Sequence, residues 1–385
     1  MFALRLFLVL VPAALWLPPA LAASVQPFGS GEVVAPADDN EKRVWGQGEE
    51  FDEMLRKSGR LLDDNELTAY VQQVMDRVFP EFQGRIRVRI VKSPQLNAFA
   101  LPNGSIYINQ GLLARFQNES QLATVLAHEG IHFINRHGHQ QMQNLKSTTA
   151  FGTLLSAIGI PAVGLVANVL AASSIFGYSR ELESEADNQG YPRVIAAGYD
   201  PRETPKIFAH LIAELKASDI KEPFFFSSHP KLQDRYDNFT RLSEKTPPPE
   251  HMPPDEYAPK FAALRVVNLE NELSMGRYKQ VLVVLNDAEQ FKNYPPHAYY
   301  YLGEAYRQRG ERGDDELLEQ AYLNAIKAAP EFAPTYRALG VYFLKKGVYE
   351  EAEKQLEKYL TLTQNPADRK YAETYLELAR KKGQN

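Results

Sequence analysis

Hydrophobic positions recur at helical spacing through residues 41–80. Because side chains three and four residues apart share one face of a helix, this periodicity predicts helices with one buried side. The recurring positions are Leu55, Leu61, Leu67, Val71, Val74 and Val78. A further helix is predicted after Asn118, since Asn118 and Gln121 have the spacing of a capping box and an apolar stripe follows them.

Strict alternation replaces helical periodicity at residues 85–90. The run Arg-Ile-Arg-Val-Arg-Ile places every second side chain on one face, which predicts a half-buried strand. Two short β-prone runs follow at 97–101 and 105–109, with an Asn-Gly pair between them that predicts a hairpin. We therefore expect a mainly α (α+β) fold with a small antiparallel sheet.

The first 22 residues have the layout of a secretory signal peptide. Arg5 precedes an apolar run, and Ala20-Leu21-Ala22 offers a small-x-small cleavage pattern. The apolar run is shorter than the ~20 residues of a bilayer span, which favours cleavage over an uncleaved anchor. We expect the mature chain to work outside the cytoplasm.

A Pro-rich stretch at 246–259 predicts a semi-rigid linker, and the pattern of the chain changes after it. Over residues 260–385 one helix–turn–helix pattern recurs, with Gly303 and Gly340 at equivalent places in two copies. Their spacing is close to the tetratricopeptide period of about 34 residues plus a short insertion. We expect an α-solenoid of stacked helical pairs, whose groove suits protein segments.

Composition narrows the functional classes. The formal net charge is −5, and this mild acidic balance gives no reason to expect nucleic-acid binding. Cysteine is absent, which excludes a disulfide framework, a cysteine-based zinc site and a thiol nucleophile.

The candidate chemistry centres on His128-Glu129-Gly130-Ile131-His132. On a helix the two histidines lie on one face, so both imidazoles can reach one metal ion. Glu129 could lie over a metal-bound water as general base, and zinc would lower the pKa of that water to about 7. A pair of surface histidines that bind nothing is the alternative.

A hydrolytic zinc site also needs a third protein ligand and an open fourth position. An acidic stretch at 179–187 is a candidate source of that ligand. Glu183 and Asp187 are four residues apart, so one carboxylate could bind the metal while the other orients a ligand. The alternative is a solvated helix face.

Four ordered motifs resemble those of the M48 family of metallopeptidases. They are His128-Glu129-x-x-His132, Ser179-Arg180-x-x-Glu183-x-x-Ala186-Asp187, the segment from Asn97 to Gly104, and Ser228-His229-Pro230 followed by Arg235. On this resemblance we assign residues 41–245 to a gluzincin-type metallopeptidase domain. Gly130 departs from the family pattern, which more often has a hydrophobic residue there, and we interpret the glycine as tolerated because that position does not face the metal.

The resemblance implies one Zn²⁺ per chain. The implied zinc ligands are His128, His132 and Glu183, and Glu129 is the implied general base. Asp187 would lie behind the ligands, and Arg235 would pair with an acid near the site, with Asp187 as the candidate.

The remaining histidines and the hairpin leave alternatives open. His229 could donate to the oxyanion of the reaction, occupy the open zinc position in a latent enzyme, or be structural. His137 and His139 are expected at the surface. The strand of Asn97, Ala98, Phe99 and Ala100 could align an extended, unfolded substrate along its edge, or be an ordinary hairpin strand.

An uncharged stretch at residues 147–179 raises the question of a membrane span. Gly and Pro residues interrupt it, and a single span would place the two histidines and Glu183 on opposite membrane faces. We expect a buried helical hairpin or a surface in peripheral contact with membrane. A membrane-embedded peptidase is the alternative.

The order of signal peptide, M48-like domain and repeats resembles family members of the Gram-negative envelope. The resemblance implies a periplasmic zinc endopeptidase that hydrolyses unfolded or misassembled envelope proteins in quality control of outer-membrane protein assembly. The repeats would contact the outer-membrane assembly machinery. The alternative is an assembly chaperone or adaptor with a largely latent peptidase site.

Overall fold

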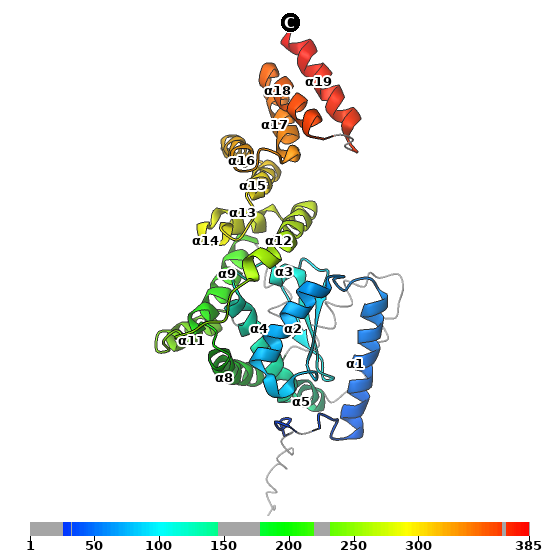
Figure 1. The fold of residues 1–385 in the computed structure, drawn as a ribbon, viewed down its shortest axis with the longest axis vertical. Helices are drawn as coiled ribbons and strands as arrows, with labels where there is room; N and C mark the ends of the chain where they lie inside the picture. The colour runs from blue at the N-terminus through cyan, green and yellow to red at the C-terminus, as the bar shows by residue number, and fades with distance from the viewer. Residues whose placement is uncertain (1–25, 32, 145–177, 219–231, 364–366, 385) are drawn as a thin grey trace, which may run out of the picture.

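The computed structural model describes residues 26–31, 33–144, 178–218, 232–363 and 367–384. The predicted signal peptide, His229 and nearly all of the uncharged stretch lie outside these residues. The described part is mostly helical, with one three-stranded sheet (Figure 1). Among the described helices, none is long and apolar enough to cross a bilayer.

The region with helical periodicity at 41–80 forms two helices. They are α1, Asp39–Lys57, and α2, Asn65–Val78. The Asp38 and Asp64 side chains cap them by accepting from the backbone N–H groups of Glu41 and Leu67, respectively. A short 3₁₀ turn, η1 (Pro80–Phe82), follows α2 and leads into the sheet.

The predicted mainly α fold with a small sheet is confirmed, but the sheet is mixed rather than antiparallel throughout. Its strands are β1, Arg87–Val91, β2, Ala98–Ala100, and β3, Ser105–Asn109, in the order β1-β3-β2. The predicted hairpin is present, because β2 and β3 pair antiparallel. However, β1 pairs parallel to β3. All five residues of β3 are buried, so it takes the centre, while β1 keeps partly exposed positions and lies at one edge.

The helix predicted after Asn118 is α4, Glu119–Ile134, and every one of its residues is buried. Asn118 caps it by accepting from the Gln121 backbone N–H at 3.0 Å. Two short helices flank it: α3, Gln110–Leu113, and α5, His137–Asn144. A buried helix of this kind holds its side chains in fixed positions, which a metal site requires.

Helix α2 packs against α4, as do α8, Arg180–Ala196, and α9, Thr204–Ser218. The 3₁₀ turn η2 (Pro201–Glu203) precedes α9, and α11, Leu232–Ser243, packs on α9. Gly190 lets α8 approach α4 closely, since a Cβ there would lie 3.2 Å from the carbonyl carbon of Ala127. Residues of α2, the sheet, α4, α8, α9 and α11 share one hydrophobic core.

The C-terminal part of the chain extends away from the sheet as successive helices (Figure 1). They are α12, Tyr257–Ser274, α13, Tyr278–Asn286, α14, Ala288–Phe291, α15, Ala298–Arg309, α16, Asp314–Ala328, α17, Ala333–Lys346, α18, Tyr349–Leu362, and α19, Arg369–Gly383. The predicted linker at 246–259 ends early, because α12 begins at Tyr257. The Tyr257 ring is fully buried in the first core, and its hydroxyl donates to Leu113 O at 2.6 Å.

The two equivalent glycines make the same kind of contact. A Cβ on Gly303 of α15 would lie 2.5 Å from the Tyr322 ring of α16, and one on Gly340 of α17 would lie 2.7 Å from Leu356 of α18. Each glycine therefore lets one helix of a pair approach the next. The helical pairs are observed, whereas their assignment as tetratricopeptide repeats stays a prediction.

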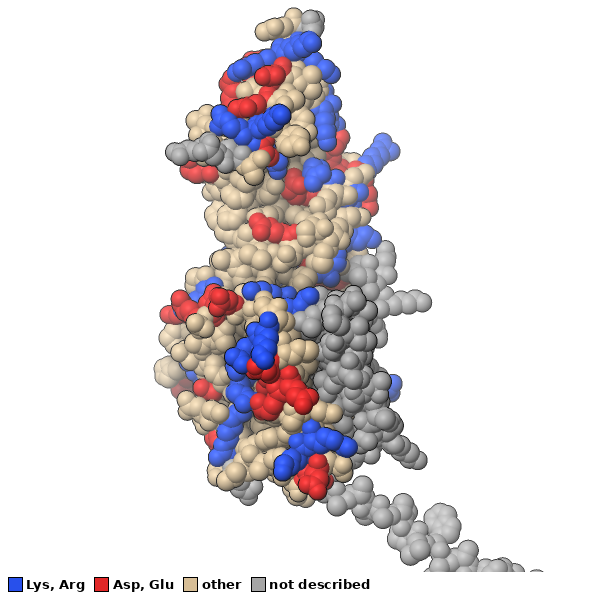
Figure 2. Space-filling model, turned by 90° about the vertical axis from the view of Figure 1, so that its right-hand side faces the viewer, with Lys and Arg blue, Asp and Glu red and all other residues tan. Residues whose placement is uncertain are grey.

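Charged side chains of both signs are interspersed over the face of the molecule in Figure 2. Across the described part of that face, basic residues do not gather into a single large patch. A broad basic patch is the usual electrostatic footprint of nucleic-acid binding. This face therefore offers no reason to revise the expectation drawn from net charge.

Candidate metal centre

His128 and His132 lie one turn apart on α4, and Glu183 reaches the same point from α8. The Nε2 atoms of His128 and His132 are 3.0 Å apart. The Glu183 carboxylate lies 3.4 Å from His128 Nε2 through Oε2 and 3.3 Å from His132 Nε2 through Oε1. Residues that the sequence separates by about fifty positions thus offer three ligand atoms within 4.8 Å of one another.

The three side chains fit zinc. Two ligands of a tetrahedral ion with bonds of about 2.0–2.1 Å lie roughly 3.3 Å apart, which is close to the carboxylate–imidazole separations here. Imidazole nitrogen and carboxylate oxygen are donors that zinc accepts, and all three groups are buried. Three protein ligands also match the number in a hydrolytic site that keeps a fourth position open.

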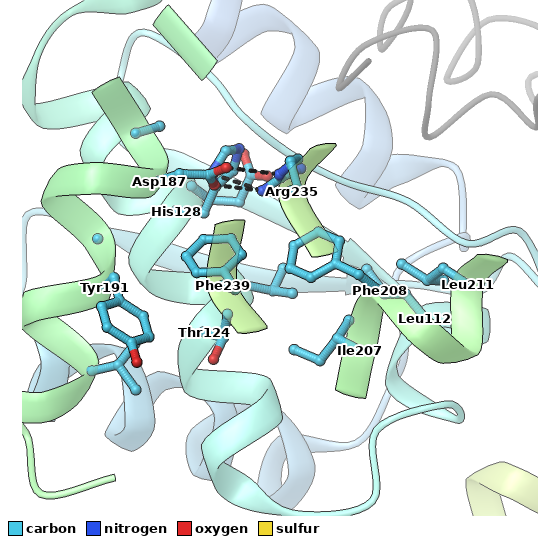
Figure 3. Close-up of a pocket in the computed structure, with 15 residues that line it drawn as sticks. Leu112, Thr124, His128, Asp187, Tyr191, Ile207, Phe208, Leu211, Arg235 and Phe239 are labelled. Atoms are coloured by element: carbon cyan, nitrogen blue, oxygen red, sulfur yellow. Dashed lines mark hydrogen bonds and ion pairs between the residues drawn. The ribbon is translucent and has the colours of Figure 1, made fainter. Parts of the chain in front are cut away.

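Asp187 and Arg235 lie next to His128 (Figure 3). Asp187 Oδ1 is 2.8 Å from His128 Nδ1, the ring nitrogen that faces away from the ligand cluster. Arg235, on α11, binds Asp187 with two hydrogen bonds, and its guanidinium lies over the Phe208 ring at 4.7 Å. The pairing expected between Arg235 and Asp187 is therefore present.

The charges around His128 favour its protonated form when no metal is bound. Burial and the Arg235 guanidinium act to lower the pKa of His128, but the Glu183 and Asp187 carboxylates outweigh them and raise the pKa to about 9. Burial alone would raise the pKa of Asp187, yet Arg235 and His128 hold it below its usual value. Asp187 is thus an anion at neutral pH, and a metal ion must compete with a proton for His128.

Glu129 is fully buried beside His128 and lines the same cavity as Asp187 and Arg235. The cavity holds about 20 Å³, roughly the space of one water molecule. Its far side is apolar, formed by residues that include Ile207, Phe208 and Phe239. A carboxylate held next to a ligand histidine can accept a proton from a water at the metal.

Gly130 packs closely against a buried ring, which gives the glycine at this position a structural reason. A Cβ at Gly130 would lie 2.2 Å from the Phe79 ring, which is itself buried in the core. Packing on the side of α4 that faces away from the metal therefore restricts which residue fits at position 130. The motif alone contains no information about Phe79, fifty-one positions earlier.

The prediction that His137 and His139 lie at the surface is also wrong. They are 0% and 2% exposed, respectively. His137 Nδ1 lies 2.8 Å from His132 Nδ1, whereas His139 Nε2 points toward Asp38 at 3.7 Å. The Tyr178 ring, which sequence reasoning did not single out, stacks on His132 with 3.8 Å between ring centroids.

The predicted substrate strand lies at an edge of the sheet. β2 pairs with β3 on one side, and no other described strand pairs with it on the other side. Asn97, Ala98, Phe99 and Ala100 are all buried. Their role with substrate stays a prediction, as do the alternatives for His229.

Comparison with known proteins identifies relatives of this region. Residues 61–243 match the family model described as Peptidase family M48. The beta-barrel assembly-enhancing protease of Escherichia coli is 26% identical over 235 residues, which cover 57% of this chain and 48% of the relative. The Vibrio cholerae protein with the name "Putative beta-barrel assembly-enhancing protease" is 30% identical over 223 residues, which cover 54% of this chain and 46% of the relative.

A relative from another lineage matches a shorter segment. The mitochondrial metalloendopeptidase OMA1 of Arabidopsis thaliana is 32% identical over 148 residues, which cover 38% of this chain and 30% of the relative. The chain thus matches about half the length of its bacterial relatives and less of this mitochondrial one.

Proposed function

We propose that this chain, whose residues 61–243 form a Peptidase family M48 domain, is a zinc-dependent endopeptidase. The observation that carries the proposal is the convergence of His128, His132 and Glu183 on one buried point. Zinc, when bound there, supplies a Lewis acid that polarises a carbonyl group and acidifies water. The residues around the site supply the rest of the chemistry.

Glu129 is the general base of the proposed reaction. It follows His128 on α4 and lines the cavity beside it, so its carboxylate can take the proton of the attacking water and pass it to the leaving amine. Asp187 accepts a hydrogen bond from His128 Nδ1–H and so turns Nε2 toward the metal. Arg235 balances the charge of Asp187 and fixes its position through two hydrogen bonds.

The substrate of the proposed reaction is an extended segment of an unfolded protein. The edge position of β2 supports this choice, because a peptide can add to a sheet edge through main-chain hydrogen bonds. Such binding reads the main chain more than the side chains, so specificity for sequence would be loose. A folded protein could not present an extended segment of this kind.

We infer from the names of the bacterial relatives that the clients are unfolded or misassembled envelope proteins in the periplasm. The stacked helical pairs of α15–α18 support contacts with the outer-membrane assembly machinery, since such pairs form surfaces for protein segments. The same pairs favour a second candidate function, an assembly adaptor whose peptidase site is largely latent. Client binding without cleavage would distinguish this second function.

The substitution Glu129→Gln tests the proposal. We expect purified wild-type protein to hold one zinc per chain and to cleave an unfolded protein such as β-casein. Glu129→Gln should keep the zinc and lose about 10²- to 10⁴-fold in kcat/KM, because only the base is removed. Glu181→Gln, an exposed carboxylate on α8, is the matched control and should cleave normally. Equal cleavage by Glu129→Gln and wild type would contradict the proposal, as would a protein that binds no zinc.

Client choice in cells needs a separate measurement. Glu129→Gln that still binds zinc should retain uncleaved clients, which can be isolated with it after brief crosslinking. We expect outer-membrane proteins among them, and the chain itself in the periplasmic fraction. Recovery of cytoplasmic proteins alone would contradict the envelope role while leaving the peptidase activity intact.

A further inference from the structure

We infer that His137 is a positioning residue that holds the zinc ligand His132 in one ring orientation and one tautomer. The inference rests on the proposed zinc site, but it concerns a residue that the zinc-binding motif does not include. Its basis is a chain of contacts that starts at His132, passes through the buried His137 and ends at Glu185 of α8, which is partly exposed.

The tautomer of His132 follows from which nitrogen faces the ligand cluster. His132 Nε2 lies 3.0 Å from His128 Nε2 and 3.3 Å from a Glu183 oxygen, so Nε2 is the atom that meets the metal. A metal-binding nitrogen offers its lone pair, which leaves the proton of a neutral imidazole on Nδ1. His137 Nδ1 lies 2.8 Å from that atom and can accept its proton.

This hydrogen bond also defines the tautomer of His137. Its Nδ1 accepts from His132, so its own proton is on Nε2. That atom is buried and lies 3.6 Å from Glu185 Oε2 on α8. The Glu185 carboxylate is held in turn by Asn135 Nδ2, which donates to its other oxygen at 2.6 Å. The contacts therefore connect His132 to the same helix that supplies Glu183.

The local fold brings His137 to this position. Helix α4 ends at Ile134, and Arg136 takes a left-handed conformation with φ of 58°. This residue interrupts the helical path before α5 begins at His137. In an uninterrupted helix, a residue five positions after His132 would not face its ring, because one turn takes about 3.6 residues. The break between the helices thus makes the contact possible.

Tyr178 restricts the same imidazole from a second direction. Its ring stacks on His132 with an interplanar angle of 11°, while the rings of His132 and His137 are inclined by 74°. Stacking limits tilting of the His132 ring, and the hydrogen bond limits its rotation. Together the two contacts hold the His132 ring so that its Nε2 points toward His128 and Glu183.

The two zinc ligands on α4 thus have different supports. His128 donates to Asp187, a carboxylate whose charge Arg235 balances. His132 donates to His137, a neutral acceptor. The neutral acceptor orients its ligand without adding another buried carboxylate beneath the ion, which would cost free energy unless a cation paired with it.

Two amide substitutions test the inference because they place an acceptor at different atoms. In His137→Asn the side-chain oxygen can take the place of Nδ1, whereas in His137→Gln the amide reaches the place of Nε2 instead. We expect zinc affinity, measured by competition with a chelator, to stay within about threefold for His137→Asn. It should fall about 10- to 100-fold for His137→Gln. His139→Gln changes the same residue type on the same helix, away from the ligand, and should bind zinc normally.

Two further measurements separate positioning from folding. The unfolding midpoint of each zinc-free protein shows whether a variant still folds, and His137→Ala replaces His137→Gln if the latter does not. The absorption spectrum of the cobalt-substituted protein reports ligand geometry, so it should change for His137→Gln and match wild type for His137→Asn.

Three outcomes would overturn the inference. The first is wild-type zinc affinity in His137→Gln, or in His137→Ala where His137→Gln does not fold. The second is an equal loss in His139→Gln, which would attribute the effect to packing of α5. The third is a wild-type protein without zinc, which would overturn the proposed function as well. A zinc-binding wild type with unaffected His137 variants would overturn this inference alone.

Discussion

Arg235 donates two hydrogen bonds to Asp187, from Nε to Oδ2 at 2.9 Å and from Nη2 to Oδ1 at 2.7 Å. The two residues lie 48 positions apart and come from α11 and α8. Since Asp187 also contacts His128 Nδ1, the orientation of this proposed metal ligand depends on α11, a helix that supplies no proposed ligand itself. The guanidinium has the planar, two-pronged shape that this contact needs.

Arg235→Lys should weaken zinc binding although it keeps the charge. A lysine ammonium cannot make two parallel hydrogen bonds to one carboxylate, so Asp187 and then His128 would lose their fixed positions. We expect zinc affinity to fall about 10- to 100-fold in a chelator competition. Arg241→Lys is the matched control, because Arg241 is exposed on the same helix and donates to Asn238 Oδ1 at 2.9 Å. Equal zinc affinities for Arg235→Lys and wild type would show that a positive charge at position 235 is enough to keep Asp187 and His128 in place.

Removal of zinc should lower the stability of the whole domain. The ligands come from α4 and α8, and an ion that binds only the folded state stabilises it by about 4 kcal/mol when free zinc exceeds the dissociation constant a thousandfold. We expect EDTA to lower the thermal midpoint of wild type. The midpoint of Glu183→Gln, which lacks one ligand, should respond less. A thermal midpoint of the wild-type protein that changes with neither EDTA nor added zinc would contradict the metal site.

Gly130→Ala should destabilise the protein even though alanine favours helices. The gain in helix propensity is about 1 kcal/mol, but the new methyl group would overlap the buried Phe79 ring. We expect a net loss of about 1–3 kcal/mol in the free energy of unfolding. Combining Gly130→Ala with Phe79→Leu should recover part of this loss, which a double-mutant cycle measures.

Gly46→Ala is the matched control for this effect. Gly46 lies within α1, is exposed and has no atom within 4 Å of the Cβ position. We expect Gly46→Ala to stabilise the protein by up to about 1 kcal/mol. If the two alanine substitutions had the same effect, propensity rather than Phe79 would govern position 130.

The parts of the fold that local chemistry determines were predictable. The Asn-Gly pair predicts the β2–β3 hairpin, and the spacing of Asn118 and Gln121 predicts the cap of α4. The separation of His128 and His132 likewise follows from helix geometry. Each of these features depends on residues within a few positions of one another, so the sequence contains the whole pattern.

The features that were missed depend on distant residues. The pairing direction of β1 depends on which strand occupies the centre of the sheet, and this is decided by burial from both faces. Gly130 leaves space for the Phe79 ring. His137 contacts His132 only because Arg136 adopts a left-handed conformation. Glu183 was assigned through the family resemblance, since spacing alone left a solvated helix face as an alternative.

A buried charge cluster joins the metal-binding part of the chain to the first helix beyond it. Arg115, after α3, donates through Nη2 to Glu214 of α9 at 3.1 Å and to Glu272 of α12 at 3.3 Å. All three side chains are almost completely buried. Burial raises the pKa of Glu272, while Arg115 acts to lower it. Removal of Arg115 should therefore raise this pKa further and leave two buried carboxylates close together.

Arg115→Met should cost about 3–5 kcal/mol of unfolding free energy at pH 7, because it removes the cation that lies between two buried carboxylates. Arg277 still donates to Glu272 at 2.6 Å and compensates part of its charge. A carboxyl group whose pKa is higher in the folded than in the unfolded state destabilises the fold above that folded pKa. As pH falls toward the unfolded value of 4.5, the folded state takes up the proton and this cost disappears. The deficit of Arg115→Met relative to wild type should thus shrink between pH 7 and pH 5, measured by urea unfolding in EDTA.

Arg380→Met provides the exposed counterpart of this substitution. Arg380 also bridges two glutamates, Glu353 and Glu357, but all three side chains are partly exposed on α18 and α19. Water solvates those carboxylates when the arginine is removed, so the loss should stay below about 1 kcal/mol at every pH. The comparison isolates burial, because the two arginines have the same kind of partners. Similar losses in the two variants, or a deficit of Arg115→Met that grows as pH falls, would contradict the view that desolvated charge governs the junction between the two parts of the chain.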